Sequence, residues 1–441
     1  MTTPHQPDAA MGTVLRRLAL PIYIPTLSGS IGLTALVPVL PLIALRLGFS
    51  VPAAAGLTII TGIIGVIGPI PIGRVMARFG EQRSLVVTGL GMIASNATAF
   101  AIVWDAEVHG NDSAHRWAFL LAFAVVSACG QVWMLGRQAY LGSELPPQYR
   151  ARGMSTFGGM MRVGQVVGPL LGAGVISISD LRWVYALAIC ADLIATVLVT
   201  VFMVPHRGQG PEPSARPVGP APRIDSREAS PYGLGRPALT SMVLTTLGIT
   251  PLMMGRVSRP IILPLLGAAL GLPPSTISLV FGIAALIEIT MFVPAGTLMD
   301  RYGRTAVVVP CLAVMGIGYV MLTVLAWTVG GRSHAGAVVA LAVSAALVAL
   351  GNGFGAGIVM TLGVDLSPEH ARTAHLARWN AFTGIGRLLG PASVSLVTLV
   401  APVAAAGLVT GVLCLAGAGW LLAWLPGVTP TPVAGPWSVR T

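Results

Sequence analysis

Long uninterrupted apolar segments constrain the fold of this chain more than any other feature of its sequence. Only 9% of the 441 residues are charged, whereas 54% are hydrophobic, and a water-soluble domain needs far more charge to cover its surface. The apolar residues gather in stretches of about 20 or more, the length that a helix needs to cross a hydrocarbon core about 30 Å thick. The sequence therefore predicts an all-α polytopic membrane protein. Continuous apolar runs argue against a β-barrel, whose strands alternate in polarity.

Twelve such stretches predict twelve transmembrane helices. They cover residues 18–45, 52–73, 84–104, 117–138, 153–178, 183–204, 238–266, 275–298, 305–328, 336–363, 376–400 and 402–425. The first stretch is too long for the apolar core of a secretory signal, and no cleavage site follows it. We therefore expect an uncleaved first span.

Arginine side chains are distributed unevenly between the loops that connect these stretches. One set of alternate loops, together with the ends of the chain, carries Arg16, Arg17, Arg74, Arg78, Arg83, Arg150, Arg152, Arg207, Arg216, Arg223, Arg227, Arg236, Arg301, Arg304, Arg372, Arg378 and Arg440. The opposite loops hold only Arg46, Arg116, Arg182 and Arg332. By the positive-inside rule, both termini and the middle loop are cytoplasmic, which indicates a multi-pass protein of the cytoplasmic membrane. Anionic lipid headgroups account for the net charge of +11, so we expect no nucleic-acid partner.

A segment rich in Pro, Gly, Ser and Arg separates six predicted spans from the other six. Such composition is typical of a flexible connector. The predicted organisation is a cytoplasmic tail (1–17), a six-helix bundle (18–204), a cytoplasmic linker (205–237), a second six-helix bundle (238–425) and a cytoplasmic tail (426–441).

Three sequence patterns recur in the same order in the two halves. The segment Pro71-Ile-Gly73-Arg-Val-Met-Ala77-Arg78-Phe-Gly80 follows the second span, and Pro294-Ala-Gly296-Thr-Leu-Met-Asp300-Arg301-Tyr-Gly303-Arg304 follows the eighth. The fifth span carries Gly164, Gly168 and Pro169, and the eleventh carries Gly386, Gly390 and Pro391 at nearly the same offset. Similar loops, 144–150 and 365–372, precede the fifth and eleventh spans. Parallel repeats of six spans imply a central cavity near the bilayer midplane.

These motifs resemble those of the major facilitator superfamily, and the likeness extends from the first span to the twelfth. Its most specific element is the loop pattern Gly-x-x-x-Asp-Arg-x-Gly-Arg, present at Gly296, Asp300, Arg301, Gly303 and Arg304. The glycines and proline of the fifth span, Gly164, Gly168, Pro169 and Gly172, are similar to a motif of many proton-driven drug exporters. The chain departs from these patterns at Ala77, Val126, Ser155 and Ala173. The resemblance implies two pseudo-symmetric six-helix bundles and secondary transport by alternating access, and we expect a monomer.

The resemblance also implies a conformational latch in the cytoplasmic loops. We expect Asp300, Arg301 and Arg304 to stabilise the outward-facing state through contacts with a helix N-terminus or with each other. The rest of the latch is Gly296 and Gly303, with Gly73, Arg78 and Gly80 in the first half. Since Ala77 replaces the acid there, the first half should latch more weakly. The alternative is a topogenic basic loop with a tight glycine turn.

Glycines at four-residue spacing in the fifth and eleventh spans lie on one face of each helix, where helix backbones can approach closely. Pro169 and Pro391 each remove a helical hydrogen bond and favour a kink. These residues, with Gly164, Gly168, Gly172, Gly386 and Gly390, predict either a hinge between the halves or tight packing.

Ionisable side chains inside the predicted spans are the candidate site, because they are costly in a membrane and usually functional. They are Glu288, Asp192, Arg256, Arg259, Arg162 and Arg387. The helical rise places Glu288 about 12 Å from the cytoplasmic end of the eighth span, a depth that Arg256 and Arg259 of the seventh span can share. These three residues are the leading proton or substrate site, the alternative being a static ion pair.

Two further ionisable residues of the spans receive a structural interpretation. We expect Asp192 to be the structural partner of an Arg or a hydroxyl, and coupling is its alternative role. Arg137 lies at a cytoplasmic helix end, from which a long side chain can extend to the water.

The favoured function is proton-coupled export of small amphipathic or drug-like molecules, since few polar groups are available to a hydrophilic substrate. A transporter of a small organic anion bound by the arginines is the alternative, and a non-transporting sensor or scaffold is the third. The sequence contains no HExxH, GxSxG or GxxxxGK[ST] pattern, so we expect neither an enzyme nor direct use of ATP. No catalytic residue, metal ligand or cofactor is predicted, and the proton gradient is the expected energy source.

Overall fold

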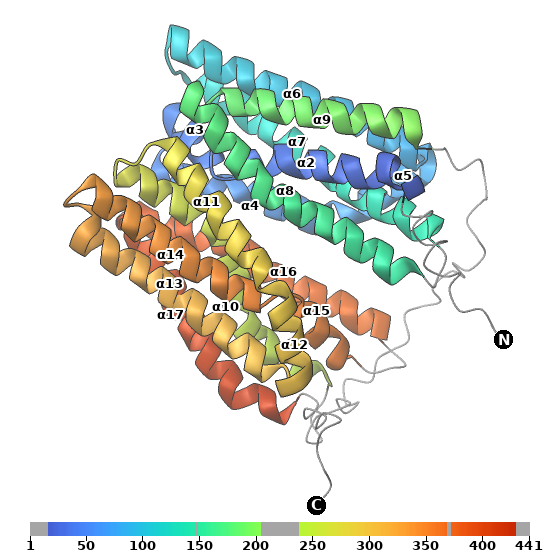
Figure 1. Ribbon diagram of the computed structural model, residues 1–441, viewed down its shortest axis with the longest axis vertical. Helices are drawn as coiled ribbons and strands as arrows, with labels where there is room; N and C mark the ends of the chain where they lie inside the picture. The colour runs from blue at the N-terminus through green and yellow to red at the C-terminus, as the bar shows by residue number, and fades with distance from the viewer. Residues whose placement is uncertain (1–15, 146–148, 204–237, 368–371, 429–441) are drawn as a thin grey trace, which may run out of the picture. The chain divides into compact units, whose positions relative to one another are not determined.

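A computed structural model describes residues 16–145, 149–203, 238–367 and 372–428 (Figure 1). Within these ranges the regular structure is helical and no strand occurs. The predicted linker (205–237) lies outside the described residues, as do most of the two predicted tails.

Helices account for every predicted span in the described part of the chain. Those before the linker are η1 (Ala19–Tyr23), α2 (Ile24–Leu36), α3 (Leu40–Arg46), α4 (Val51–Ile67), α5 (Pro69–Phe79), α6 (Glu81–His109), α7 (Ser113–Glu144), α8 (Arg150–Ile178) and α9 (Trp183–Phe202). Those after it are α10 (Ala238–Ala269), α11 (Pro274–Thr290), α12 (Phe292–Tyr302), α13 (Thr305–Leu325), η3 (Ala326–Gly330), α14 (His334–Phe354), α15 (Ile358–Asp365), α16 (Arg372–Val400), α17 (Val403–Trp424) and η5 (Leu425–Gly427). Eleven helical segments among the described residues are long and apolar enough to cross a membrane, and α4 is a shorter apolar helix. The predicted all-α membrane fold is confirmed.

Large apolar side chains remain exposed along these helices. Examples are Leu33, Val87, Leu121 and Leu396, each more than 60% exposed. Such exposure would be costly in water, but lipid tails solvate these side chains as well as a protein core does. The apolar outer surface is therefore the surface that a bilayer requires.

Prolines interrupt the second and eighth spans, each of which was predicted as a single helix. Pro71 has no N–H to donate to the carbonyl of Ile67, and α4 gives way to α5 at Gly68. Pro294 likewise leaves the carbonyl of Thr290 without its helical donor, and α11 gives way to α12 at Met291.

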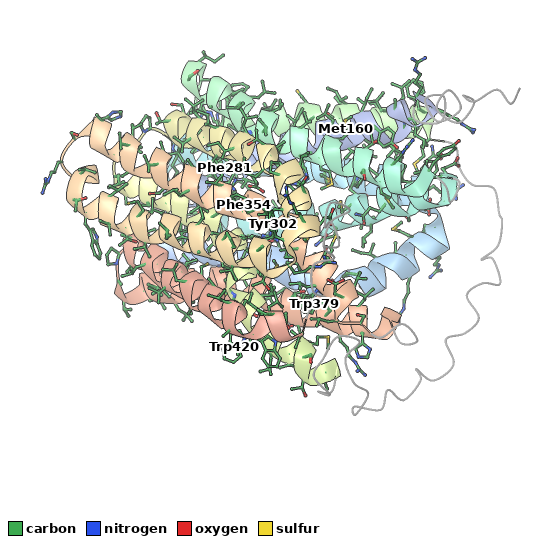
Figure 2. All side chains as sticks on the ribbon, turned by 60° about the horizontal axis from the view of Figure 1, so that its bottom comes forward. Met160, Phe281, Tyr302, Phe354, Trp379 and Trp420 are labelled. Atoms are coloured by element: carbon green, nitrogen blue, oxygen red, sulfur yellow. The ribbon has the colours of Figure 1, made fainter. Side chains whose placement is uncertain are left out.

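The first and tenth predicted spans are also interrupted. The first breaks after Leu36, where Pro38 and Pro41 remove two helical donors. The tenth breaks after Phe354, and α15 begins beyond Gly357, whose φ of +77° suits glycine. Trp379 of α16, labelled in Figure 2, then donates its indole N–H to the carbonyl of Val359 over 2.9 Å, which fastens α15 to α16.

The described residues divide into two compact units. The first unit contains the described residues within 16–50, 57–145, 149–203 and 274–282, and the second those within 51–56, 238–273, 283–367 and 372–428. In the first unit α2 packs against α8 and α9, and α6 packs against α7 and α9. In the second unit α10 packs against α16 and α17, and α13 packs against α14 and α17. The order of neighbours is therefore the same in both.

The internal repeat is also visible in the helix boundaries. Helices α4 and α11 have equal lengths, and so do α5 and α12, and α8 and α16. Gly68 alone separates α4 from α5, as Met291 alone separates α11 from α12. Gly80 and Gly303, which end α5 and α12, have φ of +83° and +87°, a backbone conformation that glycine adopts readily. The repeat seen in the sequence is thus a repeat of backbone geometry.

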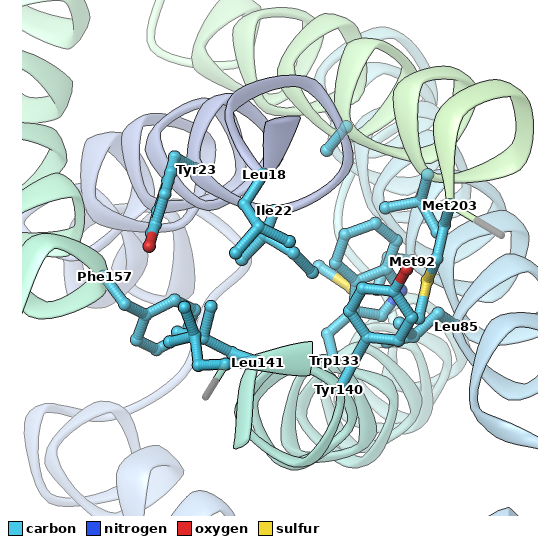
Figure 3. Close-up of a cluster of buried hydrophobic side chains, with 13 residues drawn as sticks. Leu18, Ile22, Tyr23, Leu85, Met92, Trp133, Tyr140, Leu141, Phe157 and Met203 are labelled. Carbon is cyan, nitrogen blue, oxygen red and sulfur yellow. The ribbon is translucent and has the colours of Figure 1, made fainter. Parts of the chain in front are cut away.

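The core of the first unit is formed where η1, α6, α7, α8 and α9 meet (Figure 3). Ile22, Leu141 and Phe157 are buried there, together with Trp133 and Tyr140. Side chains from five segments thus pack together to form the core of this unit.

The motif glycines of α8 and α16 pack against a helix of their own unit. At Gly164 and Gly168 of α8 an added Cβ would overlap atoms of Ser30 and Thr34 on α2. The Thr34 hydroxyl donates to the carbonyl of Gly164 over 2.8 Å. On α16, a Cβ at Gly386 would lie 3.0 Å from the carbonyl oxygen of Thr250 on α10.

Gly172 and Gly390 extend these two contacts, against Ala35 of α2 and Met254 of α10 respectively. Pro169 and Pro391 lie inside helices that continue through them. The glycines therefore act as packing residues within each unit, and their predicted role as a hinge stays a prediction.

Replacement of Gly168 by Ala should destabilise the protein. The new Cβ would lie 2.6 Å from the backbone oxygen of Ile31, so α8 and α2 must separate, at a cost of about 1–3 kcal/mol. Thermal unfolding of the purified protein in detergent, followed by tryptophan fluorescence, measures the loss. Gly174→Ala in the same helix is the matched control, since a Cβ there meets no atom within 4 Å. Equal unfolding temperatures for the two variants would contradict the packing role.

Candidate functional site

Glu288 of α11 and Arg259 of α10 form an ion pair inside the second unit. The guanidinium Nη1 donates to Glu288 Oε2 over 2.5 Å, and the side chains are 9% and 17% exposed for Arg259 and Glu288. The helical rise predicts that these residues share a depth, and the structure brings them together. A charged hydrogen bond of this kind offsets the cost of burying both groups.

Arg256, one turn before Arg259, has different partners. Its Nε donates to Asn352 Oδ1 over 2.7 Å, and its Nη2 donates to the carbonyl of Gly355 over 2.7 Å. The Asn352 side chain also acts on the Glu288 carboxylate. One polar network therefore joins α10, α11 and α14. The sequence analysis missed Asn352, although an amide inside an apolar span is a detectable signal.

Two glycines at the end of α14 make room for this network. A Cβ at Gly353 would lie 2.7 Å from the carbonyl oxygen of Glu288, and one at Gly355 would lie 2.7 Å from Arg256 Nη2. The carbonyl of Gly355 stands at the break between α14 and α15, where helical donors run out. This carbonyl accepts from the Ile358 N–H over 3.3 Å and from Arg256, which adds a second donor at the break.

The remaining predicted arginines are not part of this hydrogen-bonded network. Arg387 of α16 is exposed, and its positive charge acts on Arg256. No carboxylate of the described residues forms a salt bridge with Arg387. Arg162 of α8 is half-buried and belongs to the first unit.

Asp192 of α9 is buried in the first unit and accepts a hydrogen bond from Asn96 Nδ2 over 2.9 Å. Arg137 of α7 acts on Asp192 through its charge. The sequence suggested that Arg137 extends to the water at a helix end, which is wrong, because only 7% of this residue is exposed. Its guanidinium lies over the rings of Trp133 (5.1 Å) and Phe157 (5.9 Å), both labelled in Figure 3. These aromatic faces supply favourable surroundings inside the unit.

The predicted latch residues are placed differently from one another. Asp300 is exposed and forms no ion pair with a described residue, because it lies on the open face of α12. Arg301 lies over the ring of Tyr302 at 5.2 Å. Arg304 instead donates from Nε to Asp365 Oδ2 over 2.7 Å and from Nη2 to Oδ1 over 3.4 Å. The expected contact between Asp300 and the arginines of its own loop is therefore absent from the described residues.

Asp365 is the partner of Arg304 that the sequence analysis missed. It ends α15 and opens one of the repeated loops, which was the available signal. In the first half, the helix-ending Gly80 is followed by Glu81, whereas Gly303 is followed by Arg304, so this ion pair is not repeated.

The latch residues of the first half have few contacts. Arg78 lies over the ring of its neighbour Phe79 at 5.5 Å. Gly73, like Gly296 in the second half, has open space where a Cβ would lie, so packing does not require either glycine.

A second ionic cluster occupies the opposite end of the first unit. Arg46 Nη1 contacts Glu107 Oε1 at 3.2 Å and Asp180 Oδ1 at 2.7 Å, and Arg182 pairs with Glu107. Partial burial opposes ionisation of Asp180, but hydrogen bonds from Arg46 and the Leu181 N–H, with the charges of both arginines, hold its pKa below the usual value. A cavity of about 350 Å³ adjoins these groups. The sequence analysis had counted Arg46 and Arg182 only as outer-loop arginines.

Comparisons with known proteins agree on the family and on the fold. The sequence profile described as Major Facilitator Superfamily matches residues 22–255 and 245–440. No curated protein matches the sequence significantly. An auto-inhibited peptide transporter of the POT family is similar in structure, with a TM-score of 0.73, 13% identity, and coverage of 96% of this chain and 99% of that chain. A bacterial homologue of the iron transporter ferroportin, in its inward-facing state, gives a TM-score of 0.67, 16% identity, and coverage of 92% and 98%. Identities this low indicate likeness of fold alone.

Replacement of either partner of the Arg304–Asp365 pair should destabilise the protein by about 1–3 kcal/mol, because a partly buried charge loses its hydrogen bonds. The double variant R304Q/D365N should lose little more than each single variant. Unfolding of R304Q, D365N and the double variant in detergent tests this non-additivity. R301Q is the matched control, since Arg301 contacts the exposed ring beside it. Additive losses would show that the two residues do not act as a pair.

Proposed function

We propose, on the premise that this chain belongs to the major facilitator superfamily, that it couples proton movement to the export of small amphipathic or drug-like molecules. Membership makes the protein a multi-pass membrane transporter rather than an enzyme. Proton coupling, direction and substrate class are the proposed part.

The Glu288–Arg259 pair is the observation that supports proton coupling. A carboxylate buried among membrane helices is retained at a cost, and such residues commonly form proton relays. When Glu288 takes up a proton, its negative charge and its strong hydrogen bond with Arg259 are lost. The contact between α10 and α11 then weakens, and Arg259 becomes available to substrate or to another acceptor.

The polar residues around Glu288 connect its protonation to the cytoplasmic loop. Asn352 accepts a hydrogen bond from Arg256 and acts on the Glu288 carboxylate, and Arg256 donates to the carbonyl at the α14–α15 break. The eight residues of α15 extend about 12 Å from this break to Asp365, the partner of Arg304. A change in the charge of Glu288 therefore alters the strength of the latch through one short helix.

The scarcity of polar groups supports an amphipathic substrate. Many buried hydroxyls bond to the carbonyl one turn earlier in their own helix, as Thr26, Thr246 and Thr410 do. Such hydroxyls are already satisfied and contribute little to the recognition of a hydrophilic solute. A carrier of hydrophilic solutes would present more free amide and hydroxyl groups.

The cytoplasmic membrane is the proposed location, with both termini on the cytoplasmic side. The arginine distribution supports this orientation. At the opposite end of the first unit, the arginines are matched by the acids Glu107 and Asp180. We expect a monomer that uses the proton gradient and needs neither a cofactor nor a nucleic-acid partner.

Replacement of Glu288 by Gln tests the coupling. Gln keeps the shape and a hydrogen-bond acceptor but cannot exchange a proton, so efflux driven by a pH gradient should fall to the rate seen without a gradient. Flux of a fluorescent amphipathic cation in proteoliposomes measures this, and binding of the same dye to the purified variant should persist. E107Q is the matched control, since Glu107 belongs to the outer cluster. Gradient-driven flux in E288Q equal to that of the unmodified chain would exclude the coupling role.

A second candidate function is transport of a small organic anion. The second unit gathers Arg256, Arg259 and the exposed Arg387 around a single carboxylate, Glu288. This excess of positive charge suits a carboxylate or phosphonate group, which arginine binds through paired hydrogen bonds.

R387Q separates the two candidates. Under the anion alternative, loss of one charged hydrogen bond of about 1.5–3 kcal/mol should raise the KM for an aromatic carboxylate by about tenfold to a hundredfold. R378Q, an exposed arginine of the same helix, should leave the KM unchanged. If export of the cationic dye persists and the carboxylate is not carried, the anion alternative fails. Absence of flux for every probe under any gradient would favour the sensor or scaffold.

A further inference from the structure

The first unit contains its own buried polar cluster, separate from the Glu288 network. Arg137 and Trp133 lie one turn apart on α7, Asp192 lies on α9, and Asn96 lies on α6. None of the four residues is more than 7% exposed. A charged acid and a charged base inside one bundle carry a large desolvation cost.

The hydrogen bonds of this cluster are incomplete. Arg137 donates from Nε to the carbonyl of Trp133 over 3.0 Å. Its Nη1 is a buried atom without a hydrogen-bond partner among the described residues, and so is Trp133 Nε1. Buried donors are nearly always satisfied, and exceptions commonly mark a bound water or a functional group.

The hydrogen bonds of the Asp192 carboxyl group are also incomplete. Asn96 donates to Asp192 Oδ2, and the charge of Arg137 acts on the carboxyl, yet no salt bridge joins the two described residues within 4 Å. A purely structural ion pair in a dry interior needs direct and complete hydrogen bonds. The arrangement seen is therefore not that of a complete structural ion pair.

Neutral groups make up the rest of the surroundings. From α2, Ser28 donates to the carbonyl of Ala191 over 2.8 Å, and Gly32 packs against Ala191. From α8, Phe157 covers the guanidinium. Among the described residues, Arg137 is the charged group that acts on Asp192.

We propose that Asp192 is a second proton-binding group of this transporter and that Arg137 is the partner that replaces the proton. With the proton on the carboxyl oxygen, Asp192 is neutral and Asn96 suffices as its donor, as in this structure. When the O–H bond breaks and the proton passes to water, the carboxylate draws Arg137 Nη1 into a direct hydrogen bond.

This exchange has a mechanical consequence within the first unit. Arg137 Nη1 lies 3.9 Å from where a Cβ of Gly29 on α2 would be, and its guanidinium lies over Phe157 of α8. Movement of the guanidinium toward α9 removes it from both contacts. Protonation of Asp192 therefore changes how α7 packs against α2 and α8, independently of Glu288.

Infrared difference spectroscopy of the full chain in lipid vesicles, recorded as the pH is varied, tests the proposal without any substrate. Carbonyl stretches of protonated carboxyl groups should appear as the pH falls, and one component, that of Asp192, should be lost in D192N. E288Q, the matched control, should retain it. Over the same pH range the tryptophan emission should change in the unmodified chain and not in W133F, since Arg137 leaves the Trp133 ring.

Two further variants keep the test decisive if D192N does not fold. N96A retains the acid but removes its hydrogen bond, so the frequency of the carbonyl band should shift. R137Q removes the positive charge that favours the carboxylate, so the band should persist to more alkaline pH. A band that is unchanged in D192N, or unmoved in both N96A and R137Q, would assign the titrating acid elsewhere and overturn the proposal. Loss of gradient-driven flux in E288Q alone has no bearing on this result.

Discussion

Absence of water from the bilayer core is the constraint on which the rest of this structure depends. A backbone or side-chain polar group in hydrocarbon must find its partner within the protein. Buried threonines such as Thr26 and Thr196 therefore bond to the carbonyl one turn earlier. The same constraint explains why Arg256 donates a hydrogen bond to the carbonyl of Gly355 at a helix break. A charged side chain and a broken backbone satisfy each other there.

Helix association under this constraint cannot rely on the hydrophobic effect, because lipid is as apolar as the core. Close packing replaces it, and the glycines of α8 and α16 provide that packing against α2 and α10. Gly164 does more than leave space, since the close approach of α2 also lets Thr34 reach the carbonyl of Gly164. Packing and hydrogen bonding therefore depend on the same small residue.

Features that follow from local geometry could be predicted from the sequence. Apolar length predicted the helices, and helical rise predicted that Glu288 and Arg259 share a depth. The predictions that failed concern the direction in which a side chain points from its helix. The inward direction of Arg137 follows from aromatic rings on two helices, and Asp365 reaches Arg304 only through the break before α15. Neither relation has a spacing that a single sequence reveals. The positions of the prolines do indicate the helix breaks at Gly68 and Met291, but a prediction from hydropathy alone treats each span as one continuous helix.

The two halves share a backbone plan while their charges differ. When α4 and α5 are aligned with α11 and α12 by their boundaries, Glu288 corresponds to Gly65, Asp300 to Ala77 and Arg304 to Glu81. Backbone geometry fixes how a six-helix bundle packs, so it must be kept in both halves for the fold to form. Charge fixes only how far each conformation is favoured, and it can change in one half alone. In the second unit, α15 lies between the carbonyl that Arg256 binds and the Arg304–Asp365 ion pair. The first unit encloses Arg137 beside aromatic rings and Asp192 beside Asn96. Two bundles of one design can therefore respond to different chemical events, which a pair of identical halves could not do.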